Sequence, residues 1–360
     1  MLNKIFIKNY KCFPSYDFSL APLTLLTGAN GAGKSSLIQA ILLLKEVIDD
    51  GRSEVTVAPQ QVFGGNIGSA AQLVSQDFID DREILLSADT RQGKIKVRYK
   101  LERSNIQILK AYIEKCEFNQ MDFPMIQYLR AERIGPRLNN NIGESEDTLS
   151  TDGDNAAFLV DTADKNGWLV SDQLRYSDEP SKFSYQVEKY LSAIMGELTL
   201  NYKTDFDNAL INTLIKTAAI NDPVSEPLTG FGYSYAFPIV VAGLLCSCKP
   251  GSVFIIENPE AHLHPSAQSK MGKFLALIAS CGVQVIVETH SEHIIDGARI
   301  QSALQGQTDK MLIHFFSYSN QGTTVREIQV TKKGELSAWP KNFFDQKQID
   351  LRELLGMKRS

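Results

Sequence analysis

Short runs of apolar residues alternate with stretches of helical periodicity near the start of the chain and again after residue 230. A strand that is apolar along its whole length is typical of a sheet buried on both faces, and a helix is the usual connection between parallel strands. The pattern therefore predicts an α/β fold with a largely parallel sheet covered by helices. The expected strands are residues 23–27, 251–256 and 283–287, and the expected helices are residues 36–46, 235–245 and 264–280.

Residues 84–220 interrupt this alternation. Their first part, residues 84–118, contains three strand-like runs and predicts an inserted antiparallel β arm. Residues 184–219 carry apolar positions at helical spacing, with Leu210, Ile211, Leu214 and Ile215 on one face, and predict a helical lobe. Residues 138–166 are polar and acidic, and we expect a solvated, mobile surface segment there.

The remaining segments complete a division into four parts. Residues 1–27 predict two strands, residues 50–75 a turn-rich connection, and the tail two strands followed by a short amphipathic helix near residues 349–355. The expected parts are the first half of the α/β domain at 1–83, the arm and lobe at 84–227, the second half of that domain at 228–310, and a tail at 311–360.

One short stretch carries the clearest chemical signal. Gly28-Ala29-Asn30-Gly31-Ala32-Gly33-Lys34-Ser35 fits the phosphate-loop pattern G-x-x-x-x-G-K-[ST], between a predicted strand and a predicted helix that begins at Ser36. Glycines let main-chain N–H groups approach phosphate closely, and the helix N-terminus adds a positive field. Lys34 is placed to reach the β- and γ-phosphates, and the Ser35 hydroxyl is placed to bind Mg²⁺. Residues 28–36 are therefore expected to bind a nucleoside triphosphate with Mg²⁺, which the resemblance described below implies is ATP.

A phosphate loop requires an acidic residue at the end of another buried strand to complete the Mg²⁺ shell. Glu257 meets that requirement as a metal ligand, and Asn258 and Glu260 follow it as further catalytic candidates. His290 ends the next apolar strand and is placed to contact the γ-phosphate. A histidine at a strand end is more often structural, but the order of elements here favours function.

A second glycine-containing turn precedes the helix expected at 235–245. Gly230, Gly232 and Ser234 would form an anion-binding helix N-terminus and are candidate nucleotide contacts. Taken alone, such a turn is more often a simple helix cap. Its position between the insertion and Glu257 is what makes a role in nucleotide binding worth testing.

The composition of the chain limits the class of protein and the compartment in which it is expected. The chain has 360 residues, 43% of them hydrophobic and 22% charged, as in an ordinary globular protein. No apolar run approaches the roughly 18 residues of a membrane span, and the N-terminus does not resemble a signal peptide. The net charge of −5 gives no support for nucleic-acid binding. Five cysteines show no metal-ligand spacing, and an odd number suits a reducing compartment, so we expect a cytoplasmic protein.

These motifs together resemble the ABC-type ATPases of the Rad50/SMC and OLD-like AAA branch, and within it a bacterial family of AAA ATPases that carry the domain called DUF3696. The resemblance spans almost the whole chain. Besides the phosphate loop, it rests on residues 7–13, Ala131-Glu132-Arg133-Ile134-Gly135-Pro136-Arg137, residues 230–234, residues 256–265, residues 287–291 and Trp339-Pro340-Lys341-Asn342-Phe343-Phe344-Asp345-Gln346.

The resemblance implies a mixed-sheet ATPase head that forms a homodimer, in which two heads enclose two nucleotides. The sequence does not decide whether such dimers assemble into higher oligomers. Gly230, Gly232 and Ser234 of one head would face the phosphate loop of the other, and His290 would be the switch histidine. The glutamine that senses Mg²⁺ in such families should lie near Gln60, Gln61 or Gly64.

One position departs from the family pattern. Where these families have Asp-Glu at the strand end, this chain has Glu257-Asn258. An asparagine has no basic carboxylate and cannot act as a general base. We therefore expect either that Glu257, Glu260 or Glu288 takes that role or that hydrolysis is slow and the ATP-bound dimer acts as a long-lived switch.

Three functions follow from the resemblance. The first is the regulatory ATPase subunit of a bacterial anti-phage defence or DNA-damage system with a separate effector, such as a nuclease or another toxin-like protein. The alternative is a nucleotide-gated DNA-binding clamp, and an OLD-like nuclease is less favoured. Trp339, Phe343 and Phe344 in the tail either anchor a partner or cover the edge of the sheet.

Overall fold

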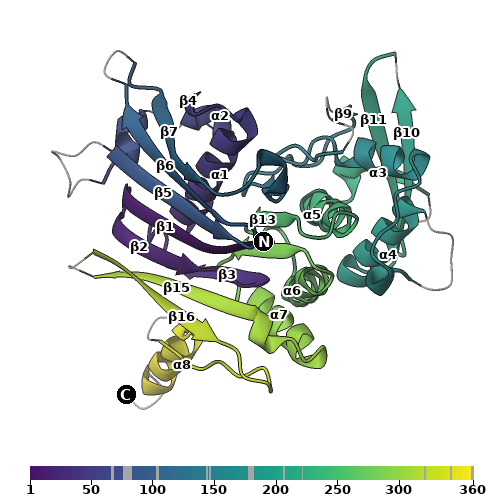
Figure 1. Ribbon diagram of the computed structural model, residues 1–360. Coiled ribbons are helices and arrows are strands. Elements are labelled where there is room, and N and C mark those ends of the chain that lie inside the picture. Colours follow the sequence, from purple (N-terminus) through teal and green to yellow (C-terminus); the bar gives the residue numbers. More distant parts are fainter. Residues whose placement is uncertain are drawn as a thin grey trace.

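The computed structural model describes residues 1–65, 69–75, 83–102, 105–142, 145, 147–176, 182–205, 207–220, 222–319, 322–340 and 343–357 (Figure 1). The strands are β1 Leu2–Tyr10, β2 Phe13–Ser19, β3 Leu23–Gly28, β4 Glu54–Val57, β5 Glu83–Thr90, β6 Lys94–Leu101, β7 Leu109–Cys116, β8 Ile126–Leu129, β9 Asn140–Asn141, β10 Leu198–Asp205, β11 Leu210–Thr217, β12 Val224–Ser225, β13 Val253–Glu257, β14 Gln284–Glu288, β15 Met311–Ser319 and β16 Gly322–Gln329. The α-helices are α1 Lys34–Asp50, α2 Pro59–Val62, α3 Ala156–Lys165, α4 Phe183–Met195, α5 Phe231–Ser247, α6 Pro265–Ser280, α7 Glu292–Leu304 and α8 Gln346–Met357.

A six-stranded central sheet positions the chemistry. Its strand order is β16-β15-β3-β14-β13-β8, parallel from β15 to β8, with β16 pairing antiparallel at one edge. Successive side chains enter two different hydrophobic clusters: Phe254 and Ile256 belong to one and Ile255 to the other. Because both faces are buried, these strands are apolar along most of their length, as the sequence pattern predicted for β3, β13 and β14.

The second sheet is antiparallel, with the order β2-β1-β5-β6-β7-β4. The runs predicted as an antiparallel arm do pair antiparallel with one another, but β5 also pairs with β1 and β7 with β4. These strands therefore lie within the body of the fold, beside α1 (Figure 1). Residues 1–28 form three strands rather than the predicted two, because a turn at Lys11, with φ of 49°, divides the first run.

The helical lobe follows the prediction in part. Helix α4 occupies the expected periodic stretch, and α3, α4 and α5 pack together beside the central sheet (Figure 1). Residues 210–217, predicted as helix, are strand β11, whose Ile211, Thr213 and Ile215 are buried at a spacing of two. The acidic segment is not all a solvated loop either, since Leu159 and Val160 of α3 lie in the core.

The tail lies against the edge of the central sheet (Figure 1). Phe343 is 1% exposed and its ring packs on Phe315 of β15 and on Trp339. Trp339 itself remains 55% exposed. Phe343 therefore packs against the sheet at β15, next to the edge strand β16, and anchoring of a partner by the tail stays a prediction. Among the described residues, no helix is long and apolar enough to cross a membrane.

Close packing of α6 on α7 generates a stability prediction. A Cβ added at Gly297 would stand 1.9 Å from the carbonyl oxygen of Ser269, and one added at Gly272 would stand 2.1 Å from that of Ile294. Gly297→Ala is expected to lower the free energy of unfolding by about 2 kcal/mol or more, because main chain must move apart. Urea unfolding measures this.

Gly356→Ala is the matched control, because a Cβ there meets nothing within 4 Å. It replaces glycine by alanine in a helix without crowding, so unfolding should be unchanged or up to about 1 kcal/mol less favourable. Equal effects of the two substitutions would show that the α6–α7 contact does not limit stability.

Candidate nucleotide site

The phosphate loop has a main-chain conformation that favours glycine at three positions. Gly28, Gly31 and Gly33 have φ values of 130°, 72° and 103°. A Cβ at Gly28 would stand 1.9 Å from the carbonyl oxygen of Phe316 on β15. Helix α1 begins directly after Gly33, so its unpaired N–H groups and the positive end of its dipole face the loop. This is a cradle for an anion.

Lys34 is buried at the floor of this cradle. Its side chain is 3% exposed, and the ammonium donates hydrogen bonds to the carbonyl oxygens of Gly28 at 3.1 Å and Ala29 at 2.9 Å. Burial lowers the pKa of Lys34, while Glu288 and Glu260 act in the opposite direction. A cation held among carbonyls in a buried loop is available to a phosphate that enters the cradle.

The carboxylate that meets the phosphate loop is Glu288. The Ser35 hydroxyl donates to its two oxygens, at 2.9 and 3.2 Å, and Lys34 Nζ lies 4.0 Å away. Burial, followed by the charge of Glu257, raises the pKa of Glu288 to about 7. Strand β14 pairs directly with β3, which leads into the loop, whereas β13 lies one strand further away. Topology therefore places Glu288 next to Ser35.

The predicted metal ligand Glu257 makes different contacts. Its carboxylate accepts hydrogen bonds from the Tyr128 hydroxyl at 3.1 Å and from the main-chain N–H of Ala131 at 3.2 Å. Burial raises the pKa of Glu257. Sequence reasoning assigned the metal to Ser35 and Glu257 and named Glu288 only as a possible base. The contact that the structure describes is between Ser35 and Glu288.

The other strand-end candidates gather around the same edge of the sheet. Asn258 has a φ of 45°, and its Oδ1 atom is buried without a hydrogen-bond partner among the described residues. Glu260 accepts hydrogen bonds from the Thr289 hydroxyl at 2.8 Å and the His290 N–H at 2.7 Å. It thereby fixes the main chain at His290, whose side chain is exposed. Burial and Lys34 lower the pKa of His290.

A cavity of about 410 Å³ opens beside the loop. It is lined by Gly28, Ala29 and His290, by the end of β15, and by Phe344. The structure therefore brings together the phosphate loop, the histidine predicted to contact phosphate, and a tail residue that the sequence did not associate with this site.

The glycine turn before α5 is a separate feature. Gly230 caps α5 with a φ of 87°, and Gly232 lies in its first turn. Neither lines the described cavity beside the phosphate loop. The Ser234 side chain is only 4% exposed. Thr229, which was not selected from the sequence, is partly exposed just before the cap, and its hydroxyl donates to the Glu226 carbonyl at 2.8 Å.

The segment expected to hold the Mg²⁺-sensing glutamine lies on and after α2. Gln60 and Gln61 are in this helix, and the Gly64 carbonyl accepts a hydrogen bond from the Arg130 guanidinium. Residues 66–68 lie outside the described residues.

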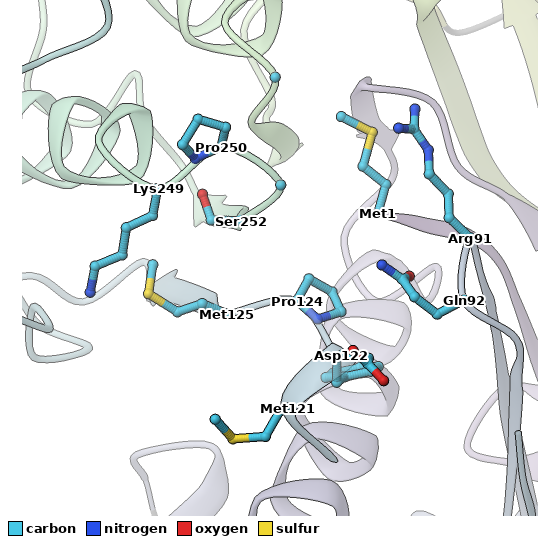
Figure 2. A pocket seen from close by; sticks show the side chains of 13 residues that line it. Met1, Arg91, Gln92, Met121, Asp122, Pro124, Met125, Lys249, Pro250 and Ser252 are labelled. Atoms are coloured by element: carbon cyan, nitrogen blue, oxygen red, sulfur yellow. The ribbon is translucent and has the colours of Figure 1, made fainter. Parts of the chain in front are cut away.

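A larger cavity, about 610 Å³, lies elsewhere (Figure 2). Met1, Arg91, Met121 and Lys249 are among its lining residues, and Ser252 precedes the start of β13. It is therefore at the amino ends of the parallel strands, whereas open α/β sheets bind ligands at the carboxyl ends. The cavity of Figure 2 is not part of the candidate site.

The residues at the loop fit ATP and Mg²⁺. The glycine cradle leaves room that any Cβ would fill at Gly28. A hydroxyl and a carboxylate, from Ser35 and Glu288, supply the hard oxygen ligands that Mg²⁺ prefers. Within the described ranges, no cluster of three or more His, Cys, Asp or Glu side chains could hold a metal by itself.

The pKa of Glu288 generates a prediction about pH. The Glu288 carboxyl keeps its proton up to about pH 7 in the folded protein, whereas its ordinary pKa is 4.5. The contribution of this protonated carboxyl to folding stability is therefore complete below pH 4.5 and is lost as the pH rises through 7. Glu288→Gln should therefore stabilise the nucleotide-free protein by roughly 2–3 kcal/mol at pH 8 and by less than about 1 kcal/mol near pH 4.5. Urea unfolding at both pH values tests this, and a difference independent of pH would contradict it.

Comparison with protein families gives two matches. The family described as "AAA ATPase domain" matches residues 1–223 and 165–295. The family described as "Protein of unknown function (DUF3696)" matches residues 307–354. The first match covers more than half of the chain, and the second covers β16, the tail aromatics and most of α8.

Two curated relatives are nucleases by name. The Old nuclease of Escherichia phage P2 is 22% identical over 359 residues, which cover 84% of this chain and 58% of that protein. The OLD nuclease of Thermus scotoductus is 43% identical over 44 residues, 12% of this chain and 8% of that protein. The chain thus spans little more than half the length of the phage P2 protein.

Solved structures show the fold. The SMC head bound to the C-winged helix domain of ScpA has a TM-score of 0.57 at 13% identity, with 92% of this chain and 98% of that chain covered. The SMC head with an extended coiled coil, bound to the C-terminal domain of ScpA from Pyrococcus furiosus, has a TM-score of 0.56 at 11% identity, with 98% and 99% covered. The chain belongs to the AAA ATPase domain family, and its fold is that of an ABC-type, SMC-like ATPase head.

Proposed function

We propose that this chain is an ATP-binding head that hydrolyses ATP slowly and dimerises around the nucleotide. The observation that carries the proposal is the buried group of Lys34, Ser35 and Glu288 at the phosphate loop. A cation, a hydroxyl and a carboxylate meet where the loop's N–H groups converge. This is the set of groups that an ATP·Mg²⁺ site requires.

In this proposal, Ser35 and Glu288 would hold Mg²⁺, and Glu257 lies behind them. When bound, Mg²⁺ would neutralise negative charge on the phosphates. Lys34 would bind the phosphates from the floor of the phosphate loop, and the N–H groups of residues 31–36 would surround them. Entry of these charges would replace the present hydrogen bond between Ser35 and Glu288 and would favour the ionised form of that carboxyl.

Slow hydrolysis follows from the groups that surround the phosphates. Asn258 is at the position where the resemblance places the base, and an amide can orient water but does not take its proton. The carboxylate of Glu260 is already held by Thr289 and His290. His290, exposed at the strand end, would contact the terminal phosphate. A site without a dedicated base favours a long-lived ATP-bound state.

Dimerisation completes the proposed site. The start of α5 would present its N–H groups and the Thr229 hydroxyl to the nucleotide of a second head, through Gly230 and Gly232. Leu228 and Phe231 next to this turn are 69% and 56% exposed, which supports a contact surface there. Ser234 would support the turn from inside, because its side chain is buried.

The system in which the head acts is a further part of the proposal. The similarity to proteins named as Old nuclease supports a regulatory ATPase of a bacterial anti-phage defence or DNA-damage system, and we propose a separate effector protein. The SMC heads were solved with a bound partner domain, which supports partner binding by this fold. A nucleotide-gated DNA-binding clamp is the alternative. Salt-dependent binding of DNA by the ATP-bound protein would favour it.

The first prediction concerns turnover. Steady-state ATP hydrolysis with Mg²⁺ should be slower than the roughly 1 per second at the low end of typical enzymes. Glu288→Gln should lower it at least about tenfold because a metal-holding carboxylate is lost, whereas Asn258→Ala should change it less than about threefold. Phosphate release measures both, with Lys34→Ala as the inactive control. Rapid turnover that Asn258→Ala abolishes, and that changes at Glu257, Glu260 and Glu288 leave intact, would contradict this account.

The second prediction tests the shared site by mixing two inactive variants. Lys34→Ala removes the phosphate contact within one head, and Thr229→Glu places a negative charge where the other head's phosphate would arrive. In an equal mixture, half of the dimers are mixed and each contains one intact site, so turnover should recover to about a quarter of wild type. Thr229→Ser keeps the hydroxyl and should be active by itself. No recovery on mixing would show that each head acts alone.

A further inference from the structure

Residues 131–137 carry part of the family resemblance and belong to a longer segment that connects two parts of the fold. Residues 128–137, from Tyr128 near the end of β8 to Arg137, are called here the bridging segment. They leave the central sheet next to β13 and pass to the loop before α5. Their contacts connect parts of the fold that are far apart in sequence.

One end of the bridging segment encloses the end of β13. Tyr128 and Ala131 hold the Glu257 carboxylate, as described above. The Arg133 guanidinium donates to the main-chain carbonyls of Glu257 at 2.7 Å and Asn258 at 2.6 Å. Both the side chain and the main chain of this strand end are therefore held by the same ten residues.

Arg133 is a buried cation. Its side chain is 5% exposed, and a third hydrogen bond, at 3.0 Å, joins it to the Arg130 carbonyl. Burial lowers the pKa of Arg133 to about 10. A guanidinium satisfied mainly by carbonyl oxygens is costly to bury, and its planar donors fix two carbonyls in one orientation.

The other end of the bridging segment contacts the start of α5. The Arg133 guanidinium lies 5.3 Å from the ring centre of Tyr235. A Cβ added at Gly135 would stand 3.3 Å from the Phe231 ring, and the Arg137 N–H donates to the Glu226 carboxylate at 3.4 Å. The segment thus contacts both the strand end of its own nucleotide site and the turn proposed to face a second head.

A second connection runs in parallel through His262. Its ring packs on Phe231 at 5.2 Å and on Tyr235 at 4.4 Å between centres. His262 and Asn258 have φ values of 60° and 45°, conformations that few non-glycine residues adopt. The loop from Asn258 to His262 therefore depends on the contacts around it for its shape.

Arg130 connects the bridging segment to the segment expected to sense Mg²⁺. Its guanidinium donates to the Gly64 carbonyl after α2 and lies 3.5 Å from Asp152. The bridging segment consequently contacts the segment expected to sense Mg²⁺, the strand end beside the metal site, and the turn before α5.

We propose that residues 128–137 couple the nucleotide state at Glu257 and Asn258 to the start of α5, with Arg133 and Tyr235 as the central contact. Nucleotide binding that moves the end of β13 moves the two carbonyls that Arg133 holds, and Arg133 transmits the movement to Tyr235. Arg133 is a positioning residue in this role and does not touch the nucleotide. The inference rests on the proposed binding of nucleotide at Lys34 and Ser35.

Hydrogen exchange tests the coupling in the monomer, at protein concentrations too low for dimers. Adding the ATP analogue AMP-PNP with Mg²⁺ should slow amide exchange of residues 229–236 in the wild type by about tenfold. Arg133→Lys retains the charge but not the planar donors, and the response should be lost while AMP-PNP affinity stays within about threefold. Tyr235→Leu, a partly exposed position, should act in the same way if Arg133→Lys folds poorly.

Arg137→Lys is the matched control, because its side chain is exposed and its main-chain contact is retained. It should keep the wild-type response. A response that survives both Arg133→Lys and Tyr235→Leu, or that is absent from wild type that binds AMP-PNP, would overturn the coupling. A full response in a protein that never dimerises with AMP-PNP would support the coupling and contradict the proposed dimer.

Discussion

The contact among Lys34, Ser35 and Glu288 is the constraint on which the site depends. It places an ammonium, a hydroxyl and a carboxylate in a buried loop, and burial raises the pKa of the carboxyl to about 7. Such a group is poorly solvated in the absence of ligand, so its arrangement opposes folding stability and favours a phosphate ligand with its metal. The surrounding sheet and helices must therefore supply the stability that this loop lacks.

The fold meets that requirement with two layers of packing. The central sheet is apolar on both faces, and its β3 and β14 strands end side by side at the phosphate loop. The antiparallel sheet and α1 cover one face, while α5, α6 and the helical lobe cover the other (Figure 1). Glycines at Gly272 and Gly297 let α6 and α7 pack closely within this second layer.

The sequence predicted the phosphate loop, the parallel strands β3, β13 and β14, and helices α1, α5 and α6, because each of these has a strong local pattern. It misassigned β11, where buried Thr213 hides the spacing of two and leaves apolar residues at helical spacing. It also predicted a solvated segment where α3 lies, because the acidic residues there are more conspicuous than the buried Leu159 and Val160. The sequence named Glu257 as the metal ligand and Glu288 as a possible base. It could not show which carboxylate contacts Ser35, because the order of strands in the sheet decides that contact.

We propose a nucleotide-gated dimer in which each head completes the nucleotide site of the other. Its most direct test is the mass of the wild-type protein in solution, measured by sedimentation with Mg²⁺ and with or without ATP, beside Lys34→Ala. We predict that the mass doubles with ATP in the wild type and stays unchanged in the variant. A wild-type mass that does not change while ATP is bound and rapidly hydrolysed would contradict the account.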